Sequence, residues 1–554
     1  MSDDEVLIRT FPGDKGTIGI SEMMRTTTVD ISESVEPPLF SHESGYYAAP
    51  FLLTMDGCEN QVYFTIDGSS PYTSGVLYSG AVSVIDCSPL PNYYANLGPV
   101  STIYDQFYPA EPVSKAMVIR AVSKRDDGTF SDESVATYFV GDEIKDYCNG
   151  AYTLSVVSDP EGLFSGYNGI YVAGNVWEMN SEEALERGVD LHEAPANYNM
   201  HGKEWRREAR LTLFAPDGTC IYDENDLINI RGDYSRSIIQ KGFNIRAKKG
   251  GQKVFDGLFD NTGEILSLRT GGEIDAFDTN IRDVLNSKIA KDLRVAPQRA
   301  VCCQVYLNGE YWGCYNLQEH LDTSFLQARY GVSKNNINLI KLRGYTEAVS
   351  GLDSDLEQFQ SVVDFVSSHD MSIAGNYDEF CAMVDIDSLI DYYCAELFFA
   401  NDDAYIYNNS MWRVRKTGSG EYEDGKWRSV LQDLDNTDGY AGEESGASTD
   451  SFADRTWIGS DPFFSGLSVN ELFRRRLYER FKELLSNDFS YERVEPIISE
   501  MEEIYTEPMV HSMRRFKDPD YQADQYAQRI QVLRDFFGDR CQYMGEYLNL
   551  HLGK

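Results

Sequence analysis

Positive charge is scarce in this sequence of 554 residues: 49 Lys and Arg stand against 89 Asp and Glu, for a formal net charge of −40. The resulting field repels nucleic acids and anionic membranes and favours a basic protein partner, although a solubilising surface explains the excess more simply. No apolar run reaches the ~18 residues that mark a membrane-spanning helix. We therefore expect neither nucleic-acid binding nor membrane insertion, and any site for an anionic ligand must be a local basic island.

Cysteine and histidine form none of the usual metal or redox patterns. The ten cysteines contain no C-x-x-C pair, and the seven histidines form no cluster or triad, which argues against a zinc site and a disulfide framework. The first residues, MSDDEVLIRTFPGDKG, lack the basic stretch and apolar stretch of a secretory signal peptide. The compartment stays open: cell-surface or extracellular if a leader has been removed, and cytoplasmic otherwise.

Length and patterning predict two or three domains. Residues 1–35 are polar, have no clear period and are interpreted as a partly ordered leader. Residues 36–142 contain short β-branched and aromatic runs divided by turn clusters such as DGSSP, which predicts a small all-β sandwich. The expected strands lie at 51–55, 61–66, 80–85, 115–123 and 134–140.

Residues 143–554 change to a mixed pattern, so the whole chain is expected to be α+β. NIRDVLNSKIAKDL (280–293) has helical spacing, and segment 300–320 predicts a hairpin turned at Asn308–Gly309. After residue 350 helical patterns dominate, most clearly at 385–400 and 529–548. We expect a β-rich lobe of about 143–320 and a helical lobe of about 321–554, with a cleft for a ligand between them.

The first cluster that could carry chemistry is NDDAYIYNN (401–409), directly after an apolar helix. It contains Asp402, Asp403, Asn408 and Asn409, and carboxylate and amide oxygens are the ligands that Mg²⁺ prefers. Phosphotransferases also pair an acid that orients the attacking hydroxyl with a metal-binding Asn, and Asp403 to Asn408 has the spacing of a kinase catalytic loop. Taken by itself, however, the cluster is better explained as an Asx-rich helix C-cap and turn.

The second cluster is VLQDLDNTDG (430–439), in which Asp433 and Asp435 stand one residue apart. On a strand, both carboxylates would point to one face, where like charges repel unless a cation binds them. The segments SMWRVR and KWRSVLQDLD predict a hairpin that brings the two acidic clusters within reach of one another. The segment is therefore predicted to bind a divalent cation, and the alternative is a strand end with a solvated acidic turn.

The third element is basic. IRGDYSRSIIQKGFNIRAKKGGQK (230–253) forms a positive island in this acidic chain. A turn of small residues flanked by Arg231 and Arg236 is suited to phosphate oxygens, and Lys241, at the start of the next predicted strand, is the better lysine candidate. For the lysines from Lys248 to Lys253, a solvated hairpin is the favoured interpretation.

At this point the sequence resembles a known family. The stretches RGDYSRS, LSLRTGGEIDAFDTNIRDVLNSKIA, VYLNGEYWGCYNLQEHLDTSFLQARYG and KWRSVLQDLDNT, with the acidic cluster before MWR, are similar to the spore coat protein H (CotH) family of atypical protein kinases. The resemblance runs from about residue 150 to the C-terminus. It implies a two-lobed kinase-like fold that binds ATP and Mg²⁺ and phosphorylates Ser or Thr of a protein substrate.

The resemblance also implies nucleotide contacts. Arg231 and Arg236 fall in the turn near the phosphates, and Lys241 is the phosphate-contacting lysine on the following strand. Glu319 falls where the lobes join and the adenine docks, and Lys341 is a second candidate for a nucleotide contact.

The remaining implied roles belong to the acidic clusters. Asp403 is the catalytic acid, with Asp402 competing for the role because the loop is one residue longer than the family pattern. The expected metal ligands are Asn408, Asn409, Asp433 and Asp435. The segment NTDGY departs from the family, so a weakly active or inactive kinase-like surface or scaffold protein is the alternative function.

The all-β segment carries a resemblance of its own. The strings LFSHESGYYAAPFLLTM, VYFTIDGSSP and KAMVIRAVS resemble the immunoglobulin-like module at the C-terminus of chitobiases and β-hexosaminidases. This implies a spacer or stacking domain, and carbohydrate binding is the less favoured alternative.

Overall fold

The structure is a computed structural model that describes residues 35–57, 60–141, 150–248, 253–272, 274–342, 346–351, 353–404, 408–440, 445–453 and 457–553. Apart from Val35, the predicted leader lies outside these residues. The chain forms two compact units, and each is described by itself. The first comprises Met1–Asp146, Leu154–Ile239 and Val305–Trp312, and the second comprises Tyr147–Thr153, Gln240–Gln304 and Gly313–Lys554.

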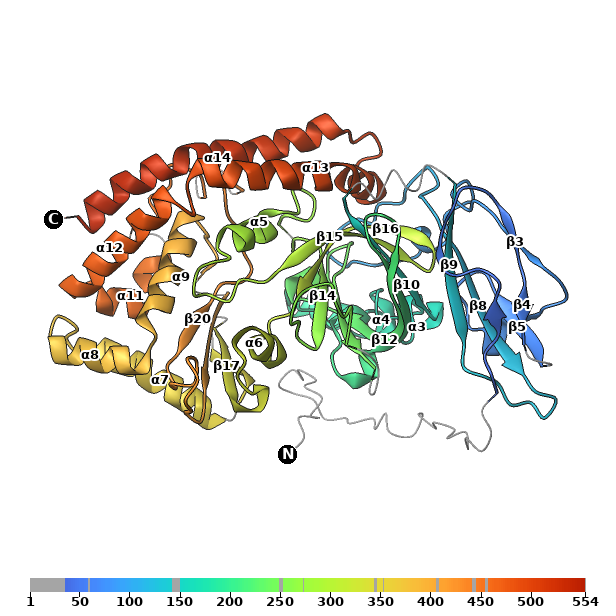
Figure 1. Cartoon of the computed structure of the whole chain (residues 1–554), viewed down its shortest axis with the longest axis horizontal. Coiled ribbons are helices and arrows are strands. Elements are labelled where there is room, and N and C mark those ends of the chain that lie inside the picture. Colours follow the sequence, from blue (N-terminus) through green and yellow to red (C-terminus); the bar gives the residue numbers. More distant parts are fainter. Residues whose placement is uncertain are drawn as a thin grey trace. The chain divides into compact units, whose positions relative to one another are not determined.

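The first unit begins with β-strands (Figure 1, blue), and each of the five predicted runs contains a strand. One sheet has the order β2-β9-β8-β5-β6, and β3 pairs with β7 and β1 with β4. Leu53, Ile119 and Tyr138 are among the buried residues of its core. The elements are β1 Leu39–Phe40, β2 Gly45–Tyr47, β3 Phe51–Leu53, β4 Met55–Asp56, β5 Gln61–Thr65, α1 Pro71–Ser74, β6 Val76–Leu77, β7 Val82–Val84, η2 Tyr94–Asn96, β8 Met117–Lys124 and β9 Ser134–Val140.

The rest of the first unit is mixed. Strands β11 and β12 form an antiparallel pair in which Arg207 faces Ile228. The predicted turn at Asn308–Gly309 has φ values of +48° and +88°, the left-handed geometry that a two-residue hairpin turn needs. The elements are α3 Pro160–Phe164, α4 Gly174–Glu186, η3 Asn197–Asn199, η4 Lys203–Trp205, β11 Arg207–Phe214, β12 Cys220–Ile230 and η5 Tyr234–Arg236. Three strands have residues in both units: β10 Tyr152–Ser158, and the strands that flank the turn, β15 Ala300–Leu307 and β16 Glu310–Glu319.

Two groups of strands lie in the second unit. Strand β14 pairs with β13 and with β16, and its last residue, Arg269, faces Asn316. A separate sheet has the order β18-β17-β19-β20. The strands are β13 Phe243–Ala247, β14 Ile265–Arg269, β17 Ile337–Leu342, β18 Thr346–Ser350, β19 Asn409–Val414 and β20 Arg428–Val430.

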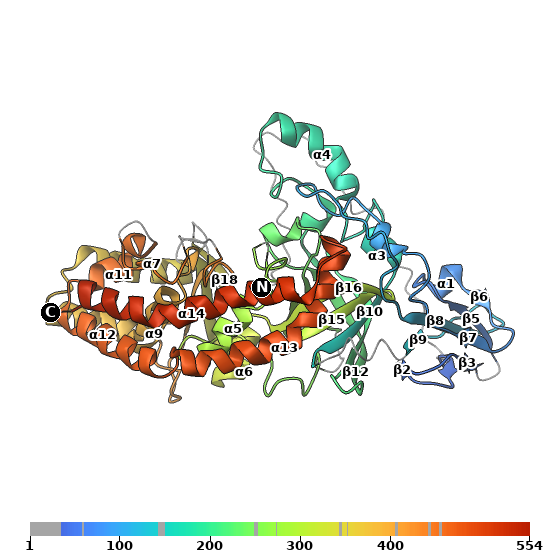
Figure 2. The ribbon, with the colours of Figure 1, turned by 90° about the horizontal axis from the view of Figure 1, so that it is seen from above.

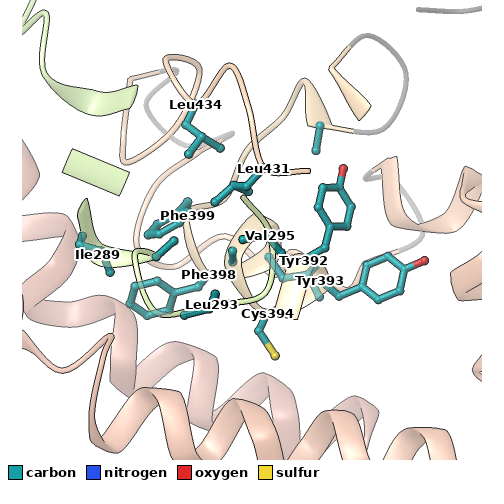
Figure 3. Packing of buried hydrophobic residues seen from close by; sticks show 14 of the residues in the cluster. Ile289, Leu293, Val295, Tyr392, Tyr393, Cys394, Phe398, Phe399, Leu431 and Leu434 are labelled. Carbon is teal, nitrogen blue, oxygen red and sulfur yellow. The ribbon is translucent and has the colours of Figure 1, made fainter. Parts of the chain in front are cut away.

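Helices complete the second unit, and α13 and α14 run side by side along it (Figure 2). Its apolar core includes Phe398 and Phe399 from the end of α9 together with Leu431 and Leu434 from the segment after β20 (Figure 3). None of the helices in the described residues is both long and apolar enough to cross a membrane. The helices are α5 Arg282–Ile289, α6 Thr323–Tyr330, η6 Lys334–Asn336, α7 Asp353–Ser368, α8 Ala374–Met383, α9 Ile386–Phe398, η7 Trp457–Ser460, α11 Pro462–Leu467, α12 Glu471–Ser486, α13 Tyr491–Phe516 and α14 Ala523–His551.

Arg540 of α14 closes the C-terminal end of α9. Its Nε donates to Phe398 O at 2.8 Å and its Nη2 to Leu397 O at 2.6 Å. Such carbonyls carry the partial negative charge of a helix end, which favours a cation. Burial lowers the pKa of Arg540 to about 10. The other donors reach the segment after β20, at Ala447 O, Thr449 O and Ser451 Oγ.

Candidate active site

The predicted hairpin is confirmed, and it brings the two acidic clusters together. Strands β19 and β20 pair antiparallel, with Ser410 facing Val430 and Trp412 facing Arg428. Asn408 precedes β19 and Asn409 begins it. Both therefore lie at the end of the hairpin at which the segment with Asp433 and Asp435 leaves β20.

The turn after α9 fixes the position of Asp403. The backbone turns sharply at Ala400, whose φ of +52° is left-handed and uncommon for a residue other than glycine. Asn401 is buried, and its Oδ1 accepts the Asp403 backbone N–H at 3.0 Å. Asn408 Nδ2 donates to Asp403 Oδ2 at 2.8 Å. Asn401 thus holds the backbone of Asp403, and Asn408 holds its carboxylate.

The environment of Asp403 tunes its proton affinity. Burial and the neighbouring carboxylates of Asp433 and Asp402 raise the pKa of Asp403 to about 7, although Asn408 and Lys341 act in the opposite direction. A carboxyl that titrates near neutral pH is suited to general acid–base catalysis. Asp402, in contrast, is exposed, and its backbone N–H donates to Asn436 O at 3.4 Å. The geometry therefore favours Asp403 over Asp402 as the working acid.

Asp433 and Asp435 do not lie on a strand, contrary to the alternation considered from the sequence. Strand β20 ends at Val430, and Asp433 has a left-handed φ of +61°, which extended strand geometry does not allow. The side chains of Leu431 and Leu434 anchor the segment in the core instead. Residues held in strained backbone conformations gather at functional sites, so this outlier supports a functional role for the segment.

A buried arginine lies between the two acids. Arg269 Nη2 contacts a carboxylate oxygen of Asp433 and lies 2.7 Å from Asp435 Oδ2, and its side chain is only 4% exposed. Its Nη1 lies 3.9 Å from Asp283 Oδ2. Burial alone would lower the pKa of Arg269, but the three surrounding carboxylates outweigh it and hold the pKa above its ordinary value. The repulsion within the acidic pair is therefore relieved inside the protein itself.

The pKa of Asp435 shows that this compensation is incomplete. Burial raises the pKa of Asp435 to about 7, the guanidinium of Arg269 lowers it, and the charge of Asp433 raises it again. One cation shared among several buried carboxylates leaves net negative charge, which is the condition under which a further cation binds favourably.

Helix α5 holds the acidic segment in place from behind. Asp283 Oδ1 accepts the Leu434 backbone N–H at 2.9 Å, and its Oδ2 accepts Gln318 Nε2 at 2.7 Å. One turn later, Asn286 Nδ2 donates to Thr437 Oγ1 at 2.9 Å and to Asp438 Oδ2 at 2.7 Å. Helix α5 thus fixes the acidic segment through hydrogen bonds to its backbone and side chains.

A glycine allows the backbone to approach Asp435 closely. Gly272 has a left-handed φ of +67°, and a Cβ placed there would lie 2.2 Å from Asp435 Oδ2. No other residue fits this space without moving the carboxylate. Gly271 and Gly272 follow β14 within three residues of Arg269. One short segment therefore contains both the arginine that pairs with Asp435 and the glycine whose backbone lies against it.

The donor set fits a hard cation in its chemistry. Carboxylate and amide oxygens suit Mg²⁺, and the buried Asn409 Oδ1 has no hydrogen-bond partner among the described residues. Over the same residues, no group of three or more His, Cys, Asp or Glu side chains is arranged to hold a metal ion. The fit therefore rests on the type of donor and not on a preformed cage.

Three other predicted residues lie in the second unit. Lys341, on β17, faces Ser410 of β19, and its charge acts on Asp403. Lys241 is fully buried. Glu319 is buried at the end of β16, where its carboxylate accepts three hydrogen bonds from Arg299, the shortest at 2.6 Å. The Glu319 side chain is therefore already engaged in an ion pair within the protein.

Arg231 and Arg236 belong to the first unit. Arg236 is buried, and its guanidinium donates to the carbonyls of Gly232, Tyr198 and Ile230 at 2.7 to 2.8 Å. Burial lowers the pKa of Arg236 to about 10. This arginine holds the turn around it together, and its donors are occupied by backbone oxygens.

Sequence reasoning missed two buried ionisable residues near the acidic clusters: Arg269, which contacts Asp435, and Glu396, which accepts a hydrogen bond from Asn401. Arg269 ends the apolar strand ILSLR, two residues before a Gly-Gly pair, and a lone arginine in a buried strand was the available signal. Glu396, inside the apolar helix DIDSLIDYYCAELFFA, gave the same kind of signal. A buried charge inside an apolar element needs a partner, and the search for that partner leads to the acidic clusters.

Comparison with known proteins identifies the family of the chain. The sequence model of the CotH kinase protein family matches residues 228–544, more than half of the chain. No match was found among the curated proteins compared. The matched region contains Arg269, Asp403 and both acids of the segment after β20. The chain therefore belongs to the CotH kinase protein family.

Proposed function

We propose that the protein is an ATP- and Mg²⁺-dependent protein kinase that transfers the γ-phosphate to Ser or Thr hydroxyls of a protein substrate. One observation carries the proposal: Asp403, whose pKa is raised to about 7 by burial and by neighbouring carboxylates, is hydrogen-bonded to Asn408 and lies close enough to Asp433 to be influenced by its charge. An acid, an amide and a second acidic segment are the parts that phosphoryl transfer uses. A two-lobed kinase-like arrangement belongs to the same proposal.

Asp403 is the group that handles the proton. In its deprotonated form it orients the acceptor hydroxyl and receives its proton as the oxygen attacks phosphorus. Asn408 donates to the carboxylate and Asn401 accepts the Asp403 backbone N–H. Side chain and backbone are therefore held in place before the reaction, which removes the need to order them during it.

Asp433 and Asp435 would hold Mg²⁺ together with the amide oxygens of Asn408 and Asn409. When bound, the ion supplies positive charge to the phosphates. The contribution of the protein is to fix the acids. Asp283 accepts the backbone N–H of Leu434 between them, and Asn286 holds the side chain of Thr437 behind them. Arg269 keeps the two carboxylates close together. Mg²⁺ at this place would share the carboxylates with Arg269 or displace it.

The nucleotide contacts belong to the same proposal. Lys341 is the favoured lysine because its charge already acts on Asp403. Contacts from Lys241, Arg231 and Arg236 follow the family pattern. A contact between Glu319 and adenine requires Arg299 to release the carboxylate. The acceptor is proposed to be basic, since the chain carries a net charge of −40.

A second candidate function is a kinase-like surface or scaffold protein that binds without transferring phosphate. Arg269 favours it, because the guanidinium occupies both acids where a metal ion would bind. The two functions predict different behaviour with nucleotide. ATP with Mg²⁺ raises the melting temperature of a kinase, whereas no shift with any divalent cation would support the binding protein.

The deciding experiment is phosphate transfer from γ-³²P-ATP, with the acceptor residue identified by mass spectrometry. We expect Asp403→Asn and Asp435→Asn to lower the rate by about 10²- to 10⁴-fold, whereas Asp402→Asn stays within a few-fold of the wild type. Asp378→Asn, at an exposed position of α8, is the matched control. Full transfer by both the Asp403 and the Asp435 variant would end the proposal.

A further inference from the structure

Helix α9 contains a carboxyl group that nothing so far explains. Glu396 is completely buried, and its helix neighbours Ala395, Leu397 and Phe398 are core residues. Figure 3 shows the apolar packing around this end of α9. A charged carboxylate in such a place is strongly unfavourable unless it is paired with a cation. The contacts of Glu396 therefore have to show what keeps it there.

Its hydrogen bonds lead to the catalytic acid. Asn401 Nδ2 donates to Glu396 Oε2 at 2.8 Å, and the Asn401 backbone N–H donates to Glu396 O at 3.2 Å. The same Asn401 side chain accepts the Asp403 backbone N–H at 3.0 Å. Glu396 and Asp403 are thus joined through one amide side chain, across the left-handed turn at Ala400.

The surroundings of Glu396 favour its neutral form. The groups that act on it are the amide of Asn401, through a hydrogen bond, and the carboxyls of Asp403 and Asp433, through their charge. Among the described residues its Oε1 has no hydrogen-bond partner. Burial, with the charges of the two acids, raises the pKa of Glu396 to about 8. A neutral carboxyl still accepts a hydrogen bond from Asn401 through its carbonyl oxygen, and it adds no negative charge beneath Asp403.

We propose that Glu396 is a positioning residue that works as a neutral carboxylic acid, fixing Asn401 and through it the backbone of Asp403. This inference deepens the proposed kinase function and rests on it. Glu396 touches neither substrate nor metal, so its effect must reach the reaction through the orientation of Asp403. Glutamine at position 396 is neutral and has the same shape as protonated glutamate, so it should still position Asn401. Alanine has no group to accept the Asn401 hydrogen bond and should not.

The protonation state is tested without activity. Infrared difference spectra of the wild-type protein and Glu396→Gln at pH 7 should show one protonated carboxyl C=O band that the variant lacks. The band should disappear from the wild type as the pH rises above about 8. If the two proteins show no difference in this region at pH 7, Glu396 is ionised and the proposal is overturned.

The positioning role is tested by a double-mutant cycle. Glu396→Ala and Asn401→Ala should each lower kcat by about tenfold or more with little change in KM for ATP, and the double variant should be no slower than the slower single variant. Glu396→Gln should stay within about twofold of the wild type. Additive losses, or failure of the glutamine variant to restore kcat, would overturn the proposal.

Failure of the kinase function has a different signature. If the wild-type protein transfers no phosphate under any condition, the proposed function fails. A crystal structure of the Glu396→Ala protein then decides the inference. Displacement of Asn401 and Asp403 supports it, and an unchanged Asp403 overturns it.

Discussion

Arg269 Nη2 lies 2.7 Å from Asp435 Oδ2, and both side chains are buried in the second unit. The guanidinium also contacts Asp433, so one internal cation serves both acids of the candidate metal site. Removing one partner of a buried ion pair leaves the other charge buried without compensation, which strongly destabilises the fold. The competition between this arginine and a metal ion is therefore measurable.

Replacing Arg269 with methionine should lower the free energy of unfolding by about 3–5 kcal/mol. Adding Mg²⁺ should recover more of the melting temperature in this variant than in the wild type, because the freed carboxylates gain a cation. Thermal unfolding in EDTA and in MgCl₂ measures both effects. Arg476→Met removes a surface pair with Asp387 and should change stability by about 1 kcal/mol or less. Equal losses of stability in the two variants would contradict the role of Arg269 as the internal cation of the acidic pair. The absence of a larger Mg²⁺ effect on the melting temperature of Arg269→Met would contradict it as well.

Gly272 offers a second test of the same carboxylate. In Gly272→Ala, the new Cβ would meet Asp435 Oδ2 at 2.2 Å and the backbone would stay at a φ of +67°. We expect phosphate transfer to fall sharply, with a stability loss of about 1–3 kcal/mol. Gly538→Ala is the control, because Gly538 lies inside α14 with nothing near its Cβ position. The free energy of unfolding of Gly538→Ala should rise by about 1 kcal/mol. Equal effects of the two substitutions would contradict the close approach of Gly272 to Asp435.

The pH profile of transfer should report on Asp403. The deprotonated acid accepts the proton, so kcat should rise with pH and reach half its maximum near pH 7. Asp402→Asn should move this midpoint down, because the charge of Asp402 raises the pKa of Asp403. Lys341→Met should move it up, because the charge of Lys341 lowers that pKa. Rates at saturating ATP measure the shifts, and movement in the same direction would contradict the geometry.

Stability should depend on pH through Glu396. Because burial and nearby carboxylates raise the pKa of Glu396 from 4.5 to about 8, the folded protein keeps a proton that the unfolded chain has lost. The free energy of unfolding should therefore fall as the pH rises from about 4.5 to about 8. Glu396→Gln cannot titrate, so its stability relative to the wild type should improve across this window. Urea unfolding at several pH values tests this, and parallel curves would exclude it.

Local patterns in the sequence predicted the local parts of this structure. The alternation and turn residues of the all-β segment, the Asn308–Gly309 turn and helix α9 follow from spacing and residue type within a short window. The hairpin of β19 and β20 could be predicted because both strands are close in sequence. It correctly placed the amide cluster beside the acidic segment.

The organisation of the site could not be read in the same way. Arg269 and Asp435 are 166 positions apart, and no local pattern predicts which buried arginine meets which buried acid. The left-handed φ of Asp433 is likewise imposed by the packing of its leucine neighbours and by Asp283. The engagement of Glu319 by Arg299 and of Arg236 by backbone carbonyls became visible only in three dimensions.

The cap that Arg540 places on α9 has a consequence for synthesis of the protein. The carbonyls at the end of α9 precede the turn that holds Asp403, and they are satisfied by a residue 142 and 143 positions further along the chain. Contacts of such long range form late in folding. Until Arg540 has emerged from the ribosome, a nascent chain lacks these contacts at the end of α9. We therefore expect the turn that holds Asp403 to become ordered only once α14 has been made and docked.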